Sequence, residues 1–131
     1  MGRPPLLLDR PLVGQVLLAV AAPALFGAVC GWLLGVDETA YTVATLLGIL
    51  GGLAAGHEHP TADEGSLRGF SGGLLFGLFI LVVHSATGVR AKATLPDHHF
   101  VLPVATTIIG IILGAIGGAL RGRHERRLAT E

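Results

Sequence analysis

The sequence predicts an all-α, polytopic membrane protein that crosses a bilayer four times as one four-helix transmembrane domain spanning residues 1–131. Only 14% of its 131 residues are charged, whereas soluble domains average roughly 25%. A spanning helix needs about 20 mainly apolar residues. Four segments of that size contain no Asp, Glu, Lys or Arg, and they are 12–34, 39–56, 69–87 and 99–120.

A very apolar soluble bundle is the alternative to a membrane protein. A chain of this size must expose a large part of its surface, and the sequence has too few polar residues to cover it. Backbone groups in hydrocarbon must be hydrogen-bonded within a helix or a closed barrel. Because the alternation typical of barrel strands is missing from the sequence, we expect helices.

The first predicted hairpin joins the spans 12–34 and 39–56 through an acidic turn at 36–38. Pro23 lies in the middle of the first span, where it removes one backbone hydrogen bond and is expected to kink the helix. The second span has 18 residues, which is close to the lower limit of roughly 17 for a crossing. A polar connection then leads to the second hairpin.

The second predicted hairpin joins 69–87 and 99–120 across a longer polar connection at 89–98. Pro103 is close to the start of the last span, where the first helical turn accommodates a proline without strain. Residues 121–131 form a basic tail that we expect to contact anionic lipid headgroups. Nucleic-acid binding is not expected of so short a tail.

The basic residues predict the direction of the spans. Short loops on the cytoplasmic side of a membrane carry an excess of Lys and Arg, and seven of the nine basic residues would lie on one side. We therefore expect both termini in the cytoplasm, with the chain in a cell membrane; the preference for Arg over Lys favours a bacterial inner membrane. The seven residues are Arg3, Arg10, Arg68, Arg121, Arg123, Arg126 and Arg127.

Glycine recurs at four-residue spacing in every predicted span. This spacing places the glycines on one helix face, and small residues let helices in lipid approach closely when no hydrophobic drive pulls them together. We call these series glycine ladders (GxxxG, or glycine zipper) and predict that they pack the helices, which leaves little room for a pore inside one protomer. The ladder residues are Gly27, Gly31, Gly35, Gly48, Gly52, Gly56, Gly69, Gly73, Gly77, Gly110, Gly114, Gly118 and Gly122.

Two interpretations of the ladders stay open. They can hold a monomeric bundle together, or they can also join protomers into a homo-oligomer, which we favour because the ladder glycines exceed what one small bundle needs. The similarity of 48–59 to 114–125, and of 25–27 to 75–77, further suggests that one hairpin was duplicated. Parallel repeats of this kind occur in transporters.

Few side chains inside the spans could have a chemical role. His84 is the one readily ionisable group that lies well inside a span, and an intramembrane ionisable residue is by default a functional hypothesis. It could line a pore or bind a solute, or it could be a neutral imidazole bonded to a neighbouring helix. Ser85, Thr106 and Thr45 are the hydroxyl groups that could join it.

A metal site is not predicted, although His57, His59 and His124 are weak candidates beside glutamates, because no regular ligand spacing is present. We expect no cofactor and no enzymatic activity, since the sequence contains no Ser–His–Asp arrangement and no phosphate loop. An enzyme mechanism would rest on His84 and its hydroxyl neighbours alone. The best functional prediction is a homo-oligomeric channel or passive transporter for a small solute or ion. The alternative is a structural or accessory membrane protein that binds a partner complex or lipid.

Overall fold

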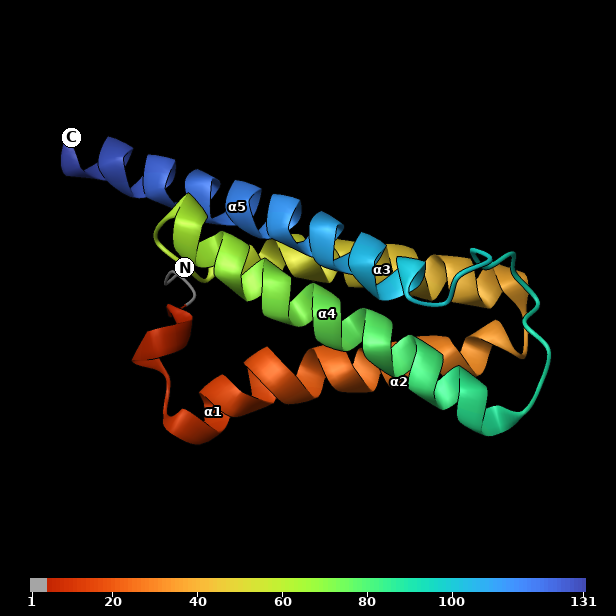
Figure 1. The fold of residues 1–131 in the computed structure, drawn as a ribbon. Coiled ribbons are helices and arrows are strands. Elements are labelled where there is room, and N and C mark those ends of the chain that lie inside the picture. Colours follow the sequence, from red (N-terminus) through yellow and green to blue (C-terminus); the bar gives the residue numbers. More distant parts are fainter. Residues whose placement is uncertain (1–4) are drawn as a thin grey trace.

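The computed structural model describes residues 5–131, and within that range the chain consists of helices and their connections, with no strand (Figure 1). Arg3, one of the arginines used to predict direction, lies outside the described residues. α1, η2 and α2 follow one another without a break and form a single long span. The elements are η1 (Leu7–Asp9), α1 (Leu12–Val16), η2 (Leu17–Ala21), α2 (Ala22–Leu34), α3 (Glu38–His57), α4 (Ala62–Thr87) and α5 (Val101–Ala129).

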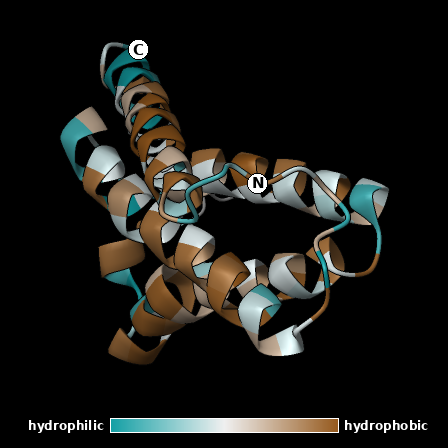
Figure 2. Ribbon diagram, turned by 45° about the vertical axis from the view of Figure 1, so that its right-hand side comes forward, coloured by the Kyte–Doolittle hydropathy of each residue, from teal (hydrophilic) through white to brown (hydrophobic). Residues whose placement is uncertain are grey.

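Four helical segments are long and apolar enough to cross a membrane, as the sequence predicted, with mean hydropathies of 1.5 to 2.2 in their most apolar windows. Large apolar side chains point outward along all of them; Leu12 is 74% exposed, Leu50 62% and Ile112 53%. Hydrophobic residues run along the helices in Figure 2, and hydrophilic residues gather at their ends. Soluble monomers rarely expose apolar surface on this scale, so the fold supports a multi-pass membrane protein.

The helices are longer than the predicted spans at two places. α4 begins at Ala62, seven residues before the expected start, because the Thr61 hydroxyl accepts a hydrogen bond from the backbone N–H of Glu64 at 3.2 Å. A threonine followed three residues later by glutamate is the capping-box spacing. α5 continues through the basic tail to Ala129. The acidic turn ends as α3 begins, where Asp37 accepts from the N–H of Ala40 at 2.7 Å.

α4 lies at the centre of the bundle. It runs antiparallel to α5, and Gly69 lies so close to Gly110 that a Cβ added to either glycine would overlap the other's carbonyl oxygen. Along α2, Gly27 and Gly31 lie in the same way against the backbone of α4. α4 therefore contacts one helix on each side, backbone against backbone.

One end of the bundle, which we call the far end, is closed by apolar packing. Cys30, Leu34 and Ile80 are fully buried there, and the connection between α4 and α5 folds over them. The backbone N–H of Lys92 in this connection donates to the carbonyl of Leu34 at 2.8 Å, which satisfies one of the free carbonyls at the end of α2.

The opposite end, which we call the termini end, holds the start of the described chain, the α3–α4 connection and the end of α5 (Figure 1). There η1 is attached to the α3–α4 connection by two contacts to one residue. The N–H of Leu7 donates to the carbonyl of Glu58 at 3.1 Å, and the Arg10 guanidinium donates to the Glu58 carboxylate at 3.1 Å. Toward this end the first helix diverges from α3 and α5 (Figure 1).

Candidate functional site

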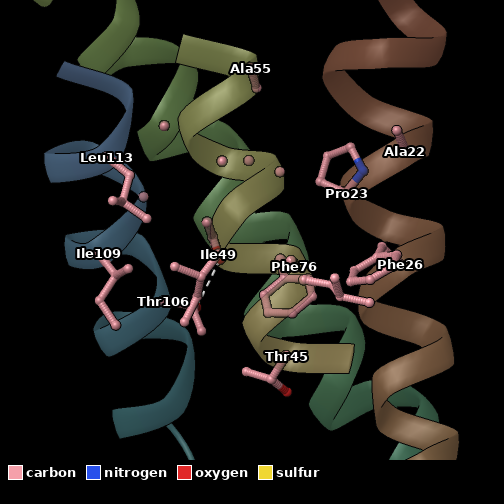
Figure 3. Close-up of a pocket in the computed structure, with 18 of the residues that line it drawn as sticks. Ala22, Pro23, Phe26, Thr45, Ile49, Ala55, Phe76, Thr106, Ile109 and Leu113 are labelled. Carbon is pink, nitrogen blue, oxygen red and sulfur yellow. Dashed lines mark hydrogen bonds between the residues drawn. The ribbon is translucent and has the colours of Figure 1, made fainter. Parts of the chain in front are cut away.

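A cavity of about 430 Å³ lies between the four helices of the single chain. Pro23 and Phe26 of α2 face it from one side, and Thr106, Ile109 and Leu113 of α5 face it from the other (Figure 3). Pockets that bind small organic molecules measure roughly 300–1,000 Å³, so the cavity has room for such a ligand. The glycine spacing had led us to expect little space inside one protomer.

The walls of this central cavity are apolar. Among the residues that line it, only Thr45, Thr106 and Arg68 have polar side chains. The Thr106 hydroxyl donates its one proton to the carbonyl oxygen of Gly73 on α4 at 2.8 Å, shared with that of Pro103 on its own helix at 3.1 Å, so its donor is used within the protein (Figure 3). A small ion that lost its hydrating water on entering the cavity would find almost no polar groups to replace that water.

The glycines of α3 differ in what they contact. Gly56 meets the backbone of Gly114, but Gly52 has only one foreign atom within reach, a methyl of Leu113 at 4.0 Å from an added Cβ, and Gly51 has none within 4 Å. Both Gly51 and Gly52 line the cavity. In the middle of α3 the missing side chains therefore make room instead of bringing two helices together.

Two aromatic rings bound the cavity toward the far end. Phe26 and Phe76 stack with ring centroids 6.0 Å apart, and a Cβ added at Gly48 would lie 3.0 Å from the Phe76 ring. Beside α3, Leu47 and Ile109 line the cavity and are 56% and 40% exposed. The two rings thus form part of the cavity wall toward the far end, and the cavity reaches the outer, apolar surface of the bundle beside α3.

Arg68 is the one charged residue among those that line the central cavity. Its guanidinium extends along α4 to Gly72, where an added Cβ would lie 2.7 Å from Nη1. Gly72 therefore leaves the space that the guanidinium fills. Nη2 donates a hydrogen bond of 2.6 Å to the carbonyl oxygen of Leu18, whereas Nε is buried without a hydrogen-bond partner.

The carbonyl oxygen of Leu18, which Arg68 binds, has no backbone donor in its own helix because of Pro23. η2 is a π-helical turn in which the N–H of Ala22 donates to the carbonyl of Leu17, five residues earlier. The next bond in this register would join the N–H of residue 23 to the carbonyl of Leu18, but proline has no N–H. Arg68 supplies the missing donor from another helix, and π-helical turns of this kind are frequent at functional sites.

A second, smaller pocket of about 290 Å³ lies at the termini end, and Arg68 lines this pocket as well. Leu8, Ser71, His59 and Glu64 are among its other residues. Arg68 therefore stands between a mixed polar pocket at the end of the bundle and the apolar cavity inside it.

His59 is buried in this end pocket, with only 8% of its surface exposed. Its Nδ1 lies 3.9 Å from the Glu64 carboxylate, and its Nε2 is buried without a hydrogen-bond partner. Burial lowers the pKa of His59 below its ordinary value of 6.5, and the nearby charge of Arg68 lowers it further, while Glu64 and Glu58 act in the opposite direction. The folded protein therefore favours the neutral imidazole.

We expect the free energy of unfolding to fall as the pH drops below about 6.5. Because the pKa of His59 is lower in the folded state than in the unfolded state, the unfolded chain binds the proton more readily, and the free energy of unfolding falls below about pH 6.5. Unfolding measured in mild detergent between pH 7.5 and pH 5 should show this slope, and His59→Asn should flatten it. An equal slope in His59→Asn would show that other groups cause the pH dependence.

His84 and Ser85, predicted as pore or binding residues, do not line the central cavity, whereas Thr45 and Thr106 do. His84 lies in the far half of α4, and its Nδ1 is buried without a hydrogen-bond partner. The structure therefore separates the predicted group into two hydroxyls at the cavity and two residues outside it.

The three weak metal candidates are not brought together. Nδ1 of His57 lies 3.3 Å from the carbonyl oxygen of Gly117, His59 faces Glu64, and His124 is exposed on α5. In the range 5–131, no three His, Cys, Asp or Glu side chains are grouped so that they could hold a metal ion.

Arg68 and Gly72 are the site residues that sequence reasoning missed. Arg68 was assigned to a connection outside the membrane and used only to predict direction. The capping box at Thr61 and Glu64 was the available signal, because it moves the start of the helix seven residues earlier and places Arg68 inside it. The glycine one turn after Arg68 lies outside the ladder spacing, which is a further sign of a separate role.

No family model, curated protein or solved structure matched this chain when they were compared with it. An apolar cavity with one cationic group and no nucleophile or carboxylate in its lining can enclose and orient a small molecule.

Proposed function

We propose that the protein is a passive transporter for small solutes that uses the cavity inside each protomer. The cavity of about 430 Å³ between the four helices is the observation that supports this proposal most directly. It lies within apolar helices and has a largely apolar wall that includes the stacked Phe26 and Phe76. A solute held there would have left water but would not yet have crossed the membrane.

In this proposal the glycine ladders are the scaffold of the transporter. The contacts of Gly69 with Gly110, and of Gly27 and Gly31 with α4, support a packing role on α2, α4 and α5. We also propose that the hairpins α2–α3 and α4–α5 arose by duplication, which is compatible with the parallel directions of α2 and α4. Homo-oligomerisation stays a prediction, and transport through a cavity within one protomer does not depend on it.

We further propose that the termini end faces the cytoplasm, from the excess of basic residues on that side. Arg123, Arg126 and Arg127 are exposed along the last turns of α5, where they are placed to meet anionic lipid headgroups. Arg121, in contrast, is only 5% exposed and forms an ion pair with Glu125 at 2.7 Å.

A structural or accessory membrane protein is the second candidate. The cavity reaches the apolar surface beside α3, where Leu47 is 56% exposed, so a lipid chain could occupy it permanently. In that case the protein would bind lipid and a partner complex without moving a solute.

Flux into proteoliposomes separates the two candidates. The purified protein is reconstituted, and the entry of three probes is compared with entry into protein-free vesicles: erythritol, hexanesulfonate and hexyltrimethylammonium. We expect at least one probe to enter faster with the protein present. If none does, the protein is not a transporter for small solutes and the accessory role is favoured.

His84→Ala is the informative variant for the path. Because His84 does not line the cavity, the flux of this variant should equal that of the original protein. A large loss of flux in a folded His84→Ala protein would place the path near His84, as the sequence alone suggested, and not through the cavity.

A further inference from the structure

Arg68 has its charge in an unusual place for a membrane arginine. It is six residues from the start of α4 at Ala62, or roughly 9 Å along the helix. Long cationic side chains close to a helix end usually extend back to the nearer membrane surface. The Arg68 guanidinium instead extends forward to Gly72, toward the middle of the bundle and into the wall of the cavity.

No ion pair or hydrogen bond joins this guanidinium to a carboxylate, although the charge of Glu58 acts on it and Glu64 lines the end pocket with it. Nη2 is bonded to a neutral carbonyl, that of Leu18, and Nε is buried without a partner. No Asp or Glu lines the central cavity, and the carboxylate of Glu58 in the α3–α4 connection is bonded to Arg10 at 3.1 Å. A partly buried cation is costly unless an anion or several hydrogen-bond acceptors accompany it.

The rest of the cavity fits a solute with an apolar body. Its wall beyond Arg68 consists of Gly, Ala, Pro, Leu, Ile and Phe together with two threonines. The Thr106 hydroxyl is bonded to the backbone, and the Thr45 hydroxyl is buried without a hydrogen-bond partner. An inorganic anion would gain Arg68 but lose its water against this wall. An amphiphile would place its apolar part against the wall and only its head at the arginine.

The second pocket offers a route for a charged head. It lies at the termini end and shares Arg68 with the central cavity. A head entering there would meet the pocket's polar side chains, which are those of Ser71, His59 and Glu64 as well as the guanidinium. It would not have to cross the apolar cavity first.

We propose that the central cavity binds amphiphilic anions, with the apolar body in the cavity and one oxyanion head paired with Arg68. This inference rests on the proposed function, since it names the solute class of the same cavity. The head could belong to a free organic acid or to the phosphate of an anionic lipid, because the chemistry that Arg68 recognises is the same.

The test is photolabelling of the whole protein in phosphatidylcholine vesicles. The probe is an alkylsulfonate with a diazirine at the end of its chain, and the labelled peptides are identified by mass spectrometry. We expect label on the cavity faces of α3 and α5. Excess hexanesulfonate should protect these sites, whereas hexyltrimethylammonium of equal chain length should not. Equal protection by both competitors would overturn the proposal, and this comparison needs no variant.

Arg68→Gln should weaken labelling of the cavity about tenfold or more, because one charge-assisted hydrogen-bonded contact is lost, and Arg68→Lys should keep part of it. Arg123→Gln is the matched control, since Arg123 is exposed on α5 away from the cavity lining. Undiminished labelling in folded Arg68→Gln would also overturn the proposal.

A second set of vesicles containing phosphatidylglycerol identifies the source of the head. Protection by this lipid would support the proposal with a lipid phosphate as the resident anion, and protection by hexanesulfonate alone would support it with a free organic acid. Failure here is distinct from failure of the transport function: labelling without flux keeps the anion site and removes the transporter. Flux with no preference for the anion keeps the transport function and removes the anion site.

Discussion

Gly69→Ala is expected to lower the free energy of unfolding by about 3 kcal/mol, whereas Gly51→Ala should leave it unchanged or raise it by up to about 1 kcal/mol. The chemical change is the same at both positions. At Gly69 the new Cβ would overlap the carbonyl oxygen of Gly110, while at Gly51 it would meet nothing within 4 Å. Because the obstacle at Gly69 is backbone, α4 and α5 must move apart.

Reversible unfolding in mixed detergent micelles, followed by the loss of helical circular dichroism, measures both changes. Gly51→Ala is the control for helix propensity, since alanine favours a helix over glycine by roughly 1 kcal/mol. Gly69→Ala and Gly110→Ala should be less than additive when combined, because one separation of the two helices relieves both overlaps. Equal effects of alanine at Gly69 and Gly51 would contradict the close approach of α4 and α5.

The sequence predicted the helices because hydrocarbon imposes a strict requirement on composition. A charge at the centre of a bilayer costs at least about 2.5 kcal/mol, so uncharged segments of sufficient length are informative without any homologue. The starts of the helices were harder to predict. The capping box at Thr61 begins α4 among charged residues such as Asp63 and Glu64, which a search for uncharged segments excludes.

Glycine spacing could not distinguish contact from empty space. Gly52 and Gly56 belong to the same ladder on the same helix, yet Gly56 meets the backbone of Gly114 and Gly52 faces the cavity. The difference lies in how α3 approaches α5: the two backbones meet at Gly56 and Gly114, whereas one turn earlier only the Leu113 side chain lies near Gly52. This approach depends on three-dimensional packing. Pro23 was predicted to kink that helix, but the sequence does not indicate that its free carbonyl would be bonded by Arg68.

Because Gly52 faces the cavity and Gly56 packs against α5, a bulky side chain at position 52 should lower transport without unfolding the protein. Gly52→Trp should reduce the flux of any transported probe about tenfold or more while the free energy of unfolding changes little. A leucine side chain removed from a packed core leaves a void on the order of 150 Å³. A tryptophan at position 52 would therefore occupy a large part of a cavity of about 430 Å³. If Gly52 packed directly against another helix, the same substitution would instead unfold the protein.

Leu50→Trp is the matched control, because it introduces the same ring two residues earlier at a side chain that is 62% exposed and outside the cavity lining. Gly52→Ala should be intermediate, since one methyl group fills little of the space. Graded loss of flux from alanine to tryptophan at position 52, with no loss at position 50, requires the solute to occupy the space beside α3. Unchanged flux in Gly52→Trp would mean that the solute crosses the membrane by a route other than the cavity.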